Sequence, residues 1–256
     1  MQRILFNNLQ LWQFDSLARE PLVQHFITDR HSISEEIEFS VSYSSSPDKG
    51  LIRTNRAALA EALAIEEDHL FFPSQVHQTR VVQITKNTSR DDLMDTDALI
   101  TNEKGVCLAV MSADCVPILL YDRKNQAIAA VHAGWRGTVA RILAKTLHEM
   151  ATAFGTRGED LITGIGPSAS QESYEVGPDV IQAVENTFGK QKGLLVYKGE
   201  KANFDLWKAN ELQLLEFGVN PSRIEISELC TVINNRYFFS ARKGDRGRFC
   251  AGLILA

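Results

Sequence analysis

A cysteine and a histidine stand on either side of one short polar segment in the middle of the chain. Residues 121–126 are polar and turn-forming, and the runs before and after them are apolar, a pattern that predicts a β-hairpin. With the turn centred on Arg123 and Lys124, Cys115 lies opposite His132. Directly opposed side chains share a face, with Cβ atoms about 4.5–5.5 Å apart. A thiolate and an imidazole placed in this way could close on one metal ion.

A third ligand is needed, and His77, just before an apolar run, is the remaining histidine that fits. Two nitrogens and one sulfur suit zinc, with Zn–N near ~2.0–2.1 Å and Zn–S near ~2.3 Å. Three protein ligands leave a position for water or substrate, which is typical of catalytic zinc and argues against a structural zinc protein. The same hairpin geometry also serves a metal-free hydrolase, with Cys115 as nucleophile and His132 as its base. Both interpretations stay open at this point.

The neighbours of these ligands add candidates. Asp114 precedes the cysteine and is either a partner that orients a ligand or a turn residue. Residues 133–138 follow the second histidine and open a helix; their glycines permit close backbone approach, and a helix N-terminus attracts anions. Arg136 either makes a charge-assisted contact to phosphate or carboxylate or lies solvated in a turn.

The elements that must position these residues are read from apolar periodicity. Short apolar runs and alternating runs predict strands at residues 37–43, 81–85, 98–101, 106–111, 116–121, 128–131, 161–165, 194–197, 224–227 and 249–255. The i, i+3, i+4 spacing predicts helices at residues 53–65, 138–154, 178–188 and 205–217. Several strands follow one another through short turns, so we expect an α/β (mixed α+β) protein with mixed sheets and helices outside them.

The bulk properties exclude several classes of protein. With 256 residues and 44% hydrophobic residues, the chain can bury a sizeable core, and we expect one domain over residues 1–256. A net charge of −5 argues against a nucleic-acid partner, because phosphate backbones require a basic face. No apolar run reaches the roughly 20 residues of a membrane span, and the first residues are too soon polar for us to expect a signal peptide there. We therefore expect a cytoplasmic protein whose four cysteines are free thiols.

Longer motifs resemble the YfiH/laccase-domain family, once labelled polyphenol oxidase, and the resemblance covers most of the chain from about residue 70 onward. The motifs that carry it are Thr96-Asp97-Ala98-Leu99-Ile100-Thr101, Ala113-Asp114-Cys115-Val116-Pro117-Ile118-Leu119, Val131-His132-Ala133-Gly134-Trp135-Arg136-Gly137, Gly166-Pro167-Ser168, Ser173-Tyr174-Glu175-Val176-Gly177, Phe204-Asp205-Leu206-Trp207, Cys230-Thr231, Ser240-Ala241-Arg242 and Gly247-Arg248.

The resemblance implies a zinc site at His77, Cys115 and His132, the three residues already singled out. It implies a layered α/β/β/α fold of the YfiH-like Cys–His hydrolase type. It further implies phosphorolysis of the purine nucleosides adenosine, inosine and methylthioadenosine, with adenosine deamination as a side activity. Bacterial members are also linked to editing of peptidoglycan precursors, which is the alternative function. One departure bears on substrate preference: residues 27–36 stand where the family carries a Gly/Ser-rich stretch ending in Ser-Leu-Asn.

The number of histidines argues against the laccase activity that the old family label suggests. A multicopper oxidase needs many imidazole ligands, and six histidines are too few to build its copper centres. Zinc is therefore the expected cofactor, with copper binding confined to conditions in vitro.

Nucleoside and phosphate as small-molecule partners require further residues. Phosphate needs a cationic cradle, and the candidates are Arg53, Arg56, Arg136, Arg242 and Arg248. Deamination needs a carboxylate that shuttles protons, and Asp114 or Glu175 could serve. The predicted catalytic residues are Cys115, His132, Asp114 and Arg136, and the oligomeric state stays open.

Overall fold

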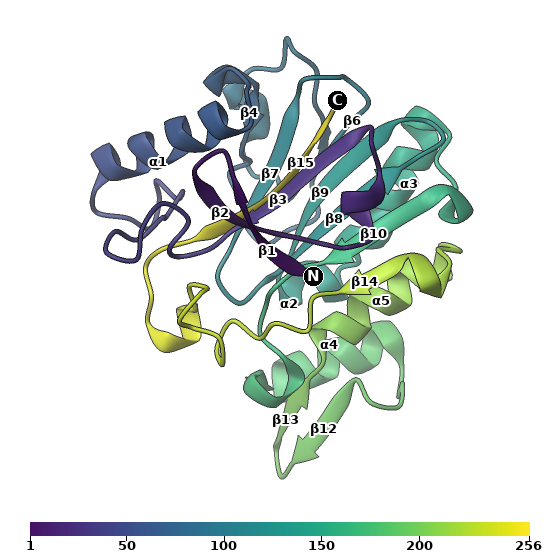
Figure 1. Ribbon diagram of the computed structural model, residues 1–256. Coiled ribbons are helices and arrows are strands. Elements are labelled where there is room, and N and C mark those ends of the chain that lie inside the picture. Colours follow the sequence, from purple (N-terminus) through teal and green to yellow (C-terminus); the bar gives the residue numbers. More distant parts are fainter.

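Two six-stranded sheets packed face to face form the centre of the computed structural model, which describes residues 1–256 (Figure 1). The first sheet has the spatial order β1 (Gln2–Phe6), β2 (Leu9–Gln13), β3 (Val23–Thr28), β15 (Phe249–Leu255), β7 (Cys107–Ser112) and β4 (Leu70–Phe71). The second has the order β14 (Ile224–Ile226), β10 (Leu161–Ile165), β8 (Val116–Asp122), β9 (Ala127–Ala133), β6 (Ala98–Thr101) and β5 (Val81–Gln83). Both sheets are mixed, because β4 pairs with β7, β5 with β6 and β14 with β10 in parallel.

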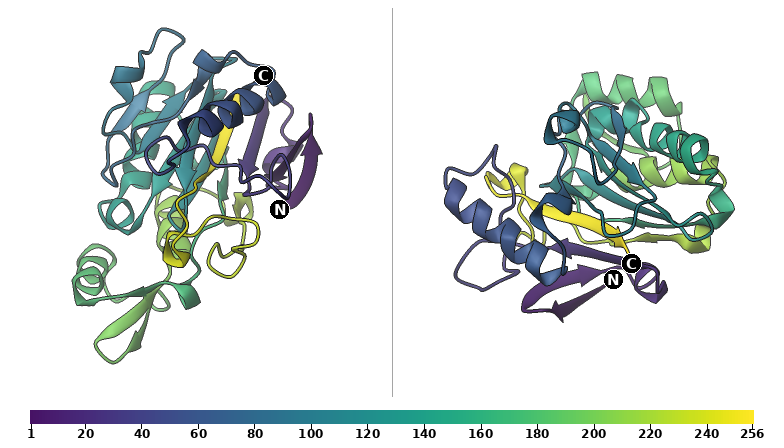
Figure 2. Two further views of the ribbon diagram at one scale, coloured as in Figure 1. Left: turned by 90° about the vertical axis from the view of Figure 1, so that its left-hand side faces the viewer. Right: turned by 90° about the horizontal axis from the view of Figure 1, so that it is seen from above.

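Helices cover the outer face of each large sheet. α1 (Lys49–Ala62) packs on the first sheet, while α3 (Ile142–Phe154), α4 (Pro178–Phe188) and α5 (Leu206–Glu216) lie on the side of the second, next to the short α2 (Trp135–Val139). The layers are therefore α/β/β/α, as predicted, and the view from above in Figure 2 shows them side by side. No helix has the length and apolar composition that crossing a bilayer requires.

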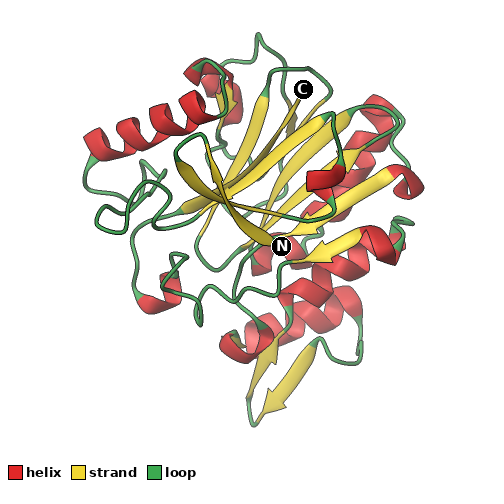
Figure 3. Cartoon of the chain, in the orientation of Figure 1, coloured by secondary structure: helices red, strands yellow, loops and turns green.

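A small third sheet stands apart from these layers. It contains β11 (Glu175–Val176), β13 (Lys201–Phe204) and β12 (Leu195–Lys198), and the β12–β13 hairpin projects from the lower end of the molecule (Figures 1 and 3). Short 3-10 turns occur at Leu17–Arg19, Glu67–His69, Arg90–Leu93, Gly158–Asp160, Gln171–Ser173, Pro221–Arg223 and Ala241–Lys243.

Strand β8 explains why the middle of the sequence is apolar throughout. Leu119 and Tyr121 point into the core between the two large sheets, and Ile118 and Leu120 point toward the helices. Successive side chains of a strand face opposite sides. Because both sides are covered, every position of this strand is buried, and a continuous apolar run is the result.

The predicted elements are confirmed most closely in the core. Ala98–Thr101, Leu161–Ile165, Pro178–Phe188 and Phe249–Leu255 have the predicted bounds. Strands β1, β2 and β3 are not among the predicted strands. β1 mixes exposed and half-buried positions and β2 mixes buried and half-buried ones, so neither five-residue run is continuously apolar.

Three predictions of local structure are wrong. Residues 37–43 bury Phe39 and Val41 but form no strand, because their backbone makes only isolated hydrogen bonds and no ladder. The first helix begins at Lys49, capped by the Asp48 carboxylate. The helix predicted at residues 138–154 is divided: Arg141 adopts the left-handed conformation (φ 62°), so α2 ends before it and α3 starts after it.

Candidate metal centre

The β8–β9 hairpin brings Cys115 and His132 together, in a register two residues away from the predicted one. Pro117, not Cys115, lies opposite His132. The connection is a four-residue loop rather than a two-residue turn, because the Asp122 carboxylate accepts the N–H groups of Lys124 and Asn125, each at 3.0 Å. A shift of two residues keeps every side chain on its own face, whereas a shift of one would exchange the faces. Cys115, just before β8, therefore still reaches the histidine.

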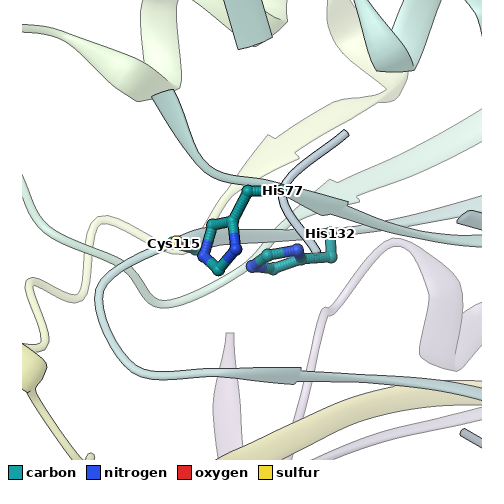
Figure 4. Close-up of side chains that lie close together, drawn as sticks. All are labelled: His77, Cys115 and His132. Carbon is teal, nitrogen blue, oxygen red and sulfur yellow. The ribbon is translucent and has the colours of Figure 1, made fainter. Parts of the chain in front are cut away.

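His77, Cys115 and His132 form one compact cluster, as predicted. Their possible ligand atoms all lie within 4.8 Å of one another. The two imidazole rings meet nearly edge to face, with centroids 4.8 Å apart and an interplanar angle of 79° (Figure 4). His132 is buried (3% exposed) and Cys115 half-buried, while His77 is exposed. The cluster is therefore open to solvent on the side of His77.

Asp97, at the start of β6, is the residue that organises this cluster. Its buried carboxylate accepts the backbone N–H groups of Val76, His77 and Gln78 at 3.2, 2.9 and 2.8 Å. It also lies 2.8 Å from Nδ1 of His132. A carboxylate in this place fixes the imidazole ring with Nδ1–H as donor, which leaves Nε2 free as a ligand.

Asp97 is not among the residues predicted for the site, although it stands in one of the family-like motifs. The orienting role was considered for Asp114 because it adjoins Cys115 in sequence. Contact with the ligands comes instead from a carboxylate on the neighbouring strand, and only the pairing of β6 with β9 brings it there.

The loop that carries His77 has a strained backbone. His77 adopts φ 63°, in the left-handed region that non-glycine residues rarely enter. Such strain persists where the surroundings determine the conformation, and here the three N–H groups bound by one carboxylate do so. The result is an imidazole held toward the cluster.

Asp114 connects three segments of the chain. Its Oδ1 accepts the hydroxyl of Thr231 at 2.6 Å, and its Oδ2 accepts the backbone N–H of Arg242 at 2.8 Å. Its own backbone has φ 83°, which turns the chain sharply into Cys115. The Asp114 carboxylate thus forms its hydrogen bonds with the C-terminal segments, which it holds next to the cluster, and not with the histidines.

Gly134 lies against two of the cluster residues, Cys115 and His77. A Cβ atom at this position would stand 3.0 Å from Sγ of Cys115 and 3.0 Å from Cδ2 of His77. Real Cβ atoms rarely come so close, so glycine is what permits the approach.

The charges of the cluster favour a thiolate. Burial raises the pKa of Cys115, but the imidazoles of His132 and His77 outweigh it and lower that pKa to about 6. Burial lowers the pKa of His132, but Cys115 and Asp97 outweigh it and raise that pKa to about 9. A metal ion at this place would therefore displace the imidazole proton rather than a thiol proton at neutral pH.

A cavity of about 960 Å³ opens beside the cluster, within the size range of small-molecule sites. All three cluster residues line it, together with Asp114. Of the predicted arginines, Arg56, Arg242 and Arg248 line the cavity as well.

The structure does not bring the other predicted residues to this cavity. Arg53 is exposed on α1, and Arg136 is exposed with its guanidinium 4.4 Å from the ring of Trp135. The helix that starts with Trp135, whose N-terminus was expected to attract an anion, has only five residues. Glu175 is paired with Lys201 on the projecting sheet.

The donor set fits a metal ion on physical grounds. Two imidazoles and one thiolate converge, one imidazole is oriented by a buried carboxylate, and the open side of the cluster faces the cavity. Three ligands with an open position are the pattern of catalytic metal sites. The four cysteines are all free, as predicted, so Cys115 is not engaged in a disulfide.

The class of protein defined by fold and site is thus an α/β/β/α protein with a candidate single-metal centre beside a cavity. Within that class, the chain belongs to the family described as multi-copper polyphenol oxidoreductase laccase, whose sequence model matches residues 24–256.

Relatives with known names agree with this assignment. A purine nucleoside phosphorylase from Bacteroides thetaiotaomicron is 38% identical over 257 residues, which covers 94% of this chain and 95% of that protein. Adenosine deaminase RL5, from an unknown prokaryotic organism, is 34% identical over 197 residues, covering 73% and 75%. The crystal structure of the YfiH protein of Bacillus licheniformis has a TM-score of 0.88 at 24% identity and covers 99% of both chains, which shows the shared fold. The predicted family and fold are confirmed.

Proposed function

We propose that this protein is a zinc-dependent purine nucleoside phosphorylase that cleaves adenosine, inosine and methylthioadenosine with phosphate. The observation that carries the proposal is one cavity that holds both the His77–Cys115–His132 cluster and several arginines. The arginines can bind the phosphate anion, and a metal ion at the cluster can act as a Lewis acid beside it. The phosphorylase name of the Bacteroides relative supports the same activity.

His77, Cys115 and His132 would hold the zinc, because two nitrogens and one thiolate match its preference. When bound, zinc supplies a Lewis acid at the wall of the cavity. Copper would enter such a set in vitro, since imidazole and thiolate also suit it.

The residues of the chain would divide the remaining work. Arginines in the cavity wall bind phosphate and aim one of its oxygens at C1′ of the ribose. A phosphate oxygen forms a bond to C1′ while the bond from C1′ to the base nitrogen breaks. The base leaves with the electron pair of that bond, and a proton must reach it. Of the two carboxylates predicted to shuttle protons in deamination, only Asp114 lines the cavity, so we assign proton transfer in phosphorolysis to Asp114 as well.

Two other activities have a specific observation behind them. The relative named adenosine deaminase supports deamination as a side activity. Cys115 with its lowered pKa, His132 beside it and Asp97 behind His132 also resemble the nucleophile, base and orienting carboxylate of a Cys–His hydrolase. That arrangement supports the alternative of editing peptidoglycan precursors without metal. A purely structural zinc site is disfavoured by the open side of the cluster.

Metal content and base release test the proposal together. Purified protein would be analysed for zinc and copper and then incubated with adenosine or inosine, with and without phosphate. About one zinc per chain and base release that requires phosphate are the expected results. Metal-free protein that cleaves amide bonds of precursor peptides, and releases no base, would establish the hydrolase instead.

We further propose that the chain forms one domain and that the protein is cytoplasmic. The free thiols of its four cysteines are consistent with that compartment.

A further inference from the structure

Two half-buried arginines in the cavity wall have no carboxylate partner, whereas the third unpaired arginine there, Arg242, is exposed. Among the cations that line the cavity, Arg90 forms an ion pair with Asp68. Arg242 lies 4.3 Å from the ring of Tyr174. Arg56 and Arg248 form no ion pair, although both side chains are half-buried. An unpaired, partly desolvated cation is costly, so these two positions point to an anion that the cavity receives.

Arg56 is clamped in one orientation. Its guanidinium lies 4.6 Å from the ring centroid of Tyr43 and 4.1 Å from that of Phe72, and its Nε–H donates to the carbonyl of Val41 at 2.8 Å. A guanidinium has five N–H donors, and only this one meets an oxygen of the chain. Burial lowers the pKa of Arg56 to about 10, which still leaves the group cationic at neutral pH.

Arg248 is fastened to the same stretch of backbone. The N–H of Val41 donates to the carbonyl of Arg248 at 3.1 Å, and the N–H of Arg248 donates to the hydroxyl of Ser40 at 3.0 Å. Nη1 of Arg248 donates to carbonyl oxygens of its own turn, the shortest at 2.7 Å. Val41 therefore accepts from the side chain of Arg56 through its carbonyl and donates to the backbone of Arg248 through its N–H, so one residue connects the two arginines before any ligand arrives.

A short chain of contacts connects this pair with the metal ligands. Nη2 of Arg56 lies 3.9 Å from the sulfur of Met111. The backbone of Met111 is held on both sides by the amide of Gln75, with bonds of 2.7 and 2.8 Å. Gln75 is two residues from His77, so an anion bound at Arg56 would lie in the part of the cavity that leads to the cluster.

We propose that Arg56 and Arg248 form the phosphate subsite of this cavity. Two cations on a preset backbone match a dianionic tetrahedral oxyanion, and guanidinium groups bind phosphate through paired hydrogen bonds. Arg53 and Arg136, two of the five arginines predicted as candidates for the phosphate cradle, lie outside the cavity and take no part. This inference rests on the proposed phosphorylase function for its ligand, inorganic phosphate.

The test measures phosphate binding directly, by isothermal titration calorimetry of the zinc-loaded protein with inorganic phosphate in the absence of nucleoside. We expect the Kd for phosphate to rise at least about tenfold in Arg56→Met and in Arg248→Met, because each loses charge-assisted hydrogen bonds. Arg53→Met is the matched control, since it removes the same charge one helical turn away on the exposed side of α1, and its Kd should stay unchanged. Arg56→Lys keeps a charge between the two rings if Arg56→Met does not fold, and it should weaken binding by a smaller factor.

Two results overturn the inference: no phosphate binding by the unaltered protein, or unchanged affinity in folded Arg56 and Arg248 variants. Base release from inosine with phosphate is measured on the same samples. If the protein binds phosphate through Arg56 and Arg248 but releases no base, the anion subsite is supported and the phosphorylase function is contradicted. The failure of one proposal can therefore be distinguished from the failure of the other.

Discussion

Asp97 lies 2.8 Å from Nδ1 of His132, and its remaining hydrogen bonds hold the backbone around His77. One buried carboxylate thus orients two histidines that come from different segments, the strand β9 and the loop before β5. The hydrogen bonds to His132 and to the N–H groups of Gln78 and His77 lower the pKa of Asp97, although burial works to raise it. The geometry of the cluster therefore depends on this residue being ionised.

Asp97→Asn should weaken metal binding without removing a ligand. The amide has one oxygen and adds an NH₂ group, so it cannot accept all four N–H groups and can present a donor to His132. We expect metal affinity to fall roughly 10–100-fold, the usual cost of losing such a partner. Titration against a chelator of known affinity measures the change. Asp122→Asn is the control, because it alters another buried carboxylate that binds backbone N–H groups at the far end of the hairpin. Equal affinity in the two variants would contradict the role of Asp97.

Gly134→Ala should disturb the cluster through a single methyl group. Because that methyl would stand 3.0 Å from Sγ of Cys115, the sulfur or the His77 ring must shift. We expect reduced metal occupancy and lower activity in a protein that still folds, measured by elemental analysis and base release. Gly50→Ala on α1 is the control, since its Cβ would approach only the carboxylate end of Asp48. Full metal occupancy in Gly134→Ala would show that the cluster tolerates the displacement.

Cys115→Ala should abolish both metal binding and turnover, because the thiolate is the one soft ligand of the set. Elemental analysis and the base-release assay read out the two losses. Cys230→Ala serves as the comparison: its sulfur contacts Ser170 and Ser173 rather than the cluster, and metal content should remain at the unaltered level. Full zinc occupancy in Cys115→Ala would end the ligand assignment.

His25 should make folding stability depend on pH far from the candidate site. Burial lowers the pKa of His25 to about 4, and its Nε2 accepts the N–H of Phe14. Between pH 6.5 and 4 the unfolded chain binds a proton at His25 that the folded chain does not, so the free energy of unfolding decreases as pH falls. The contribution is about 1.4 kcal/mol per pH unit in this window.

Denaturant unfolding between pH 4.5 and 7 measures this dependence. His25→Gln should have a shallower decrease than the unaltered protein, whereas His148→Gln, on the exposed side of α3, should keep the original slope. Equal slopes for all three proteins would show that His25 is not buried in its neutral form.

The sequence by itself determined the elements that are buried on both sides. Ala98–Thr101, Leu161–Ile165 and Phe249–Leu255 were predictable to the residue, because a strand covered on both faces is a continuous apolar run bounded by polar turns. It also indicated that His77, Cys115 and His132 lie together. The two-residue error in the hairpin register did not matter for them, since an even shift preserves the face on which a side chain lies.

Only the tertiary structure decided what surrounds those three residues. Asp97 reaches His132 through the pairing of β6 with β9, and Arg56 meets the cavity because α1 packs on the first sheet beside Val41. The sequence alone does not distinguish Arg53 from Arg56, which both lie on α1. In the structure Arg53 is exposed to solvent, whereas Arg56 lines the cavity. Ion pairs and hydrogen bonds at a site depend on distances between segments that are far apart along the chain. The local periodicity of a sequence does not predict those distances.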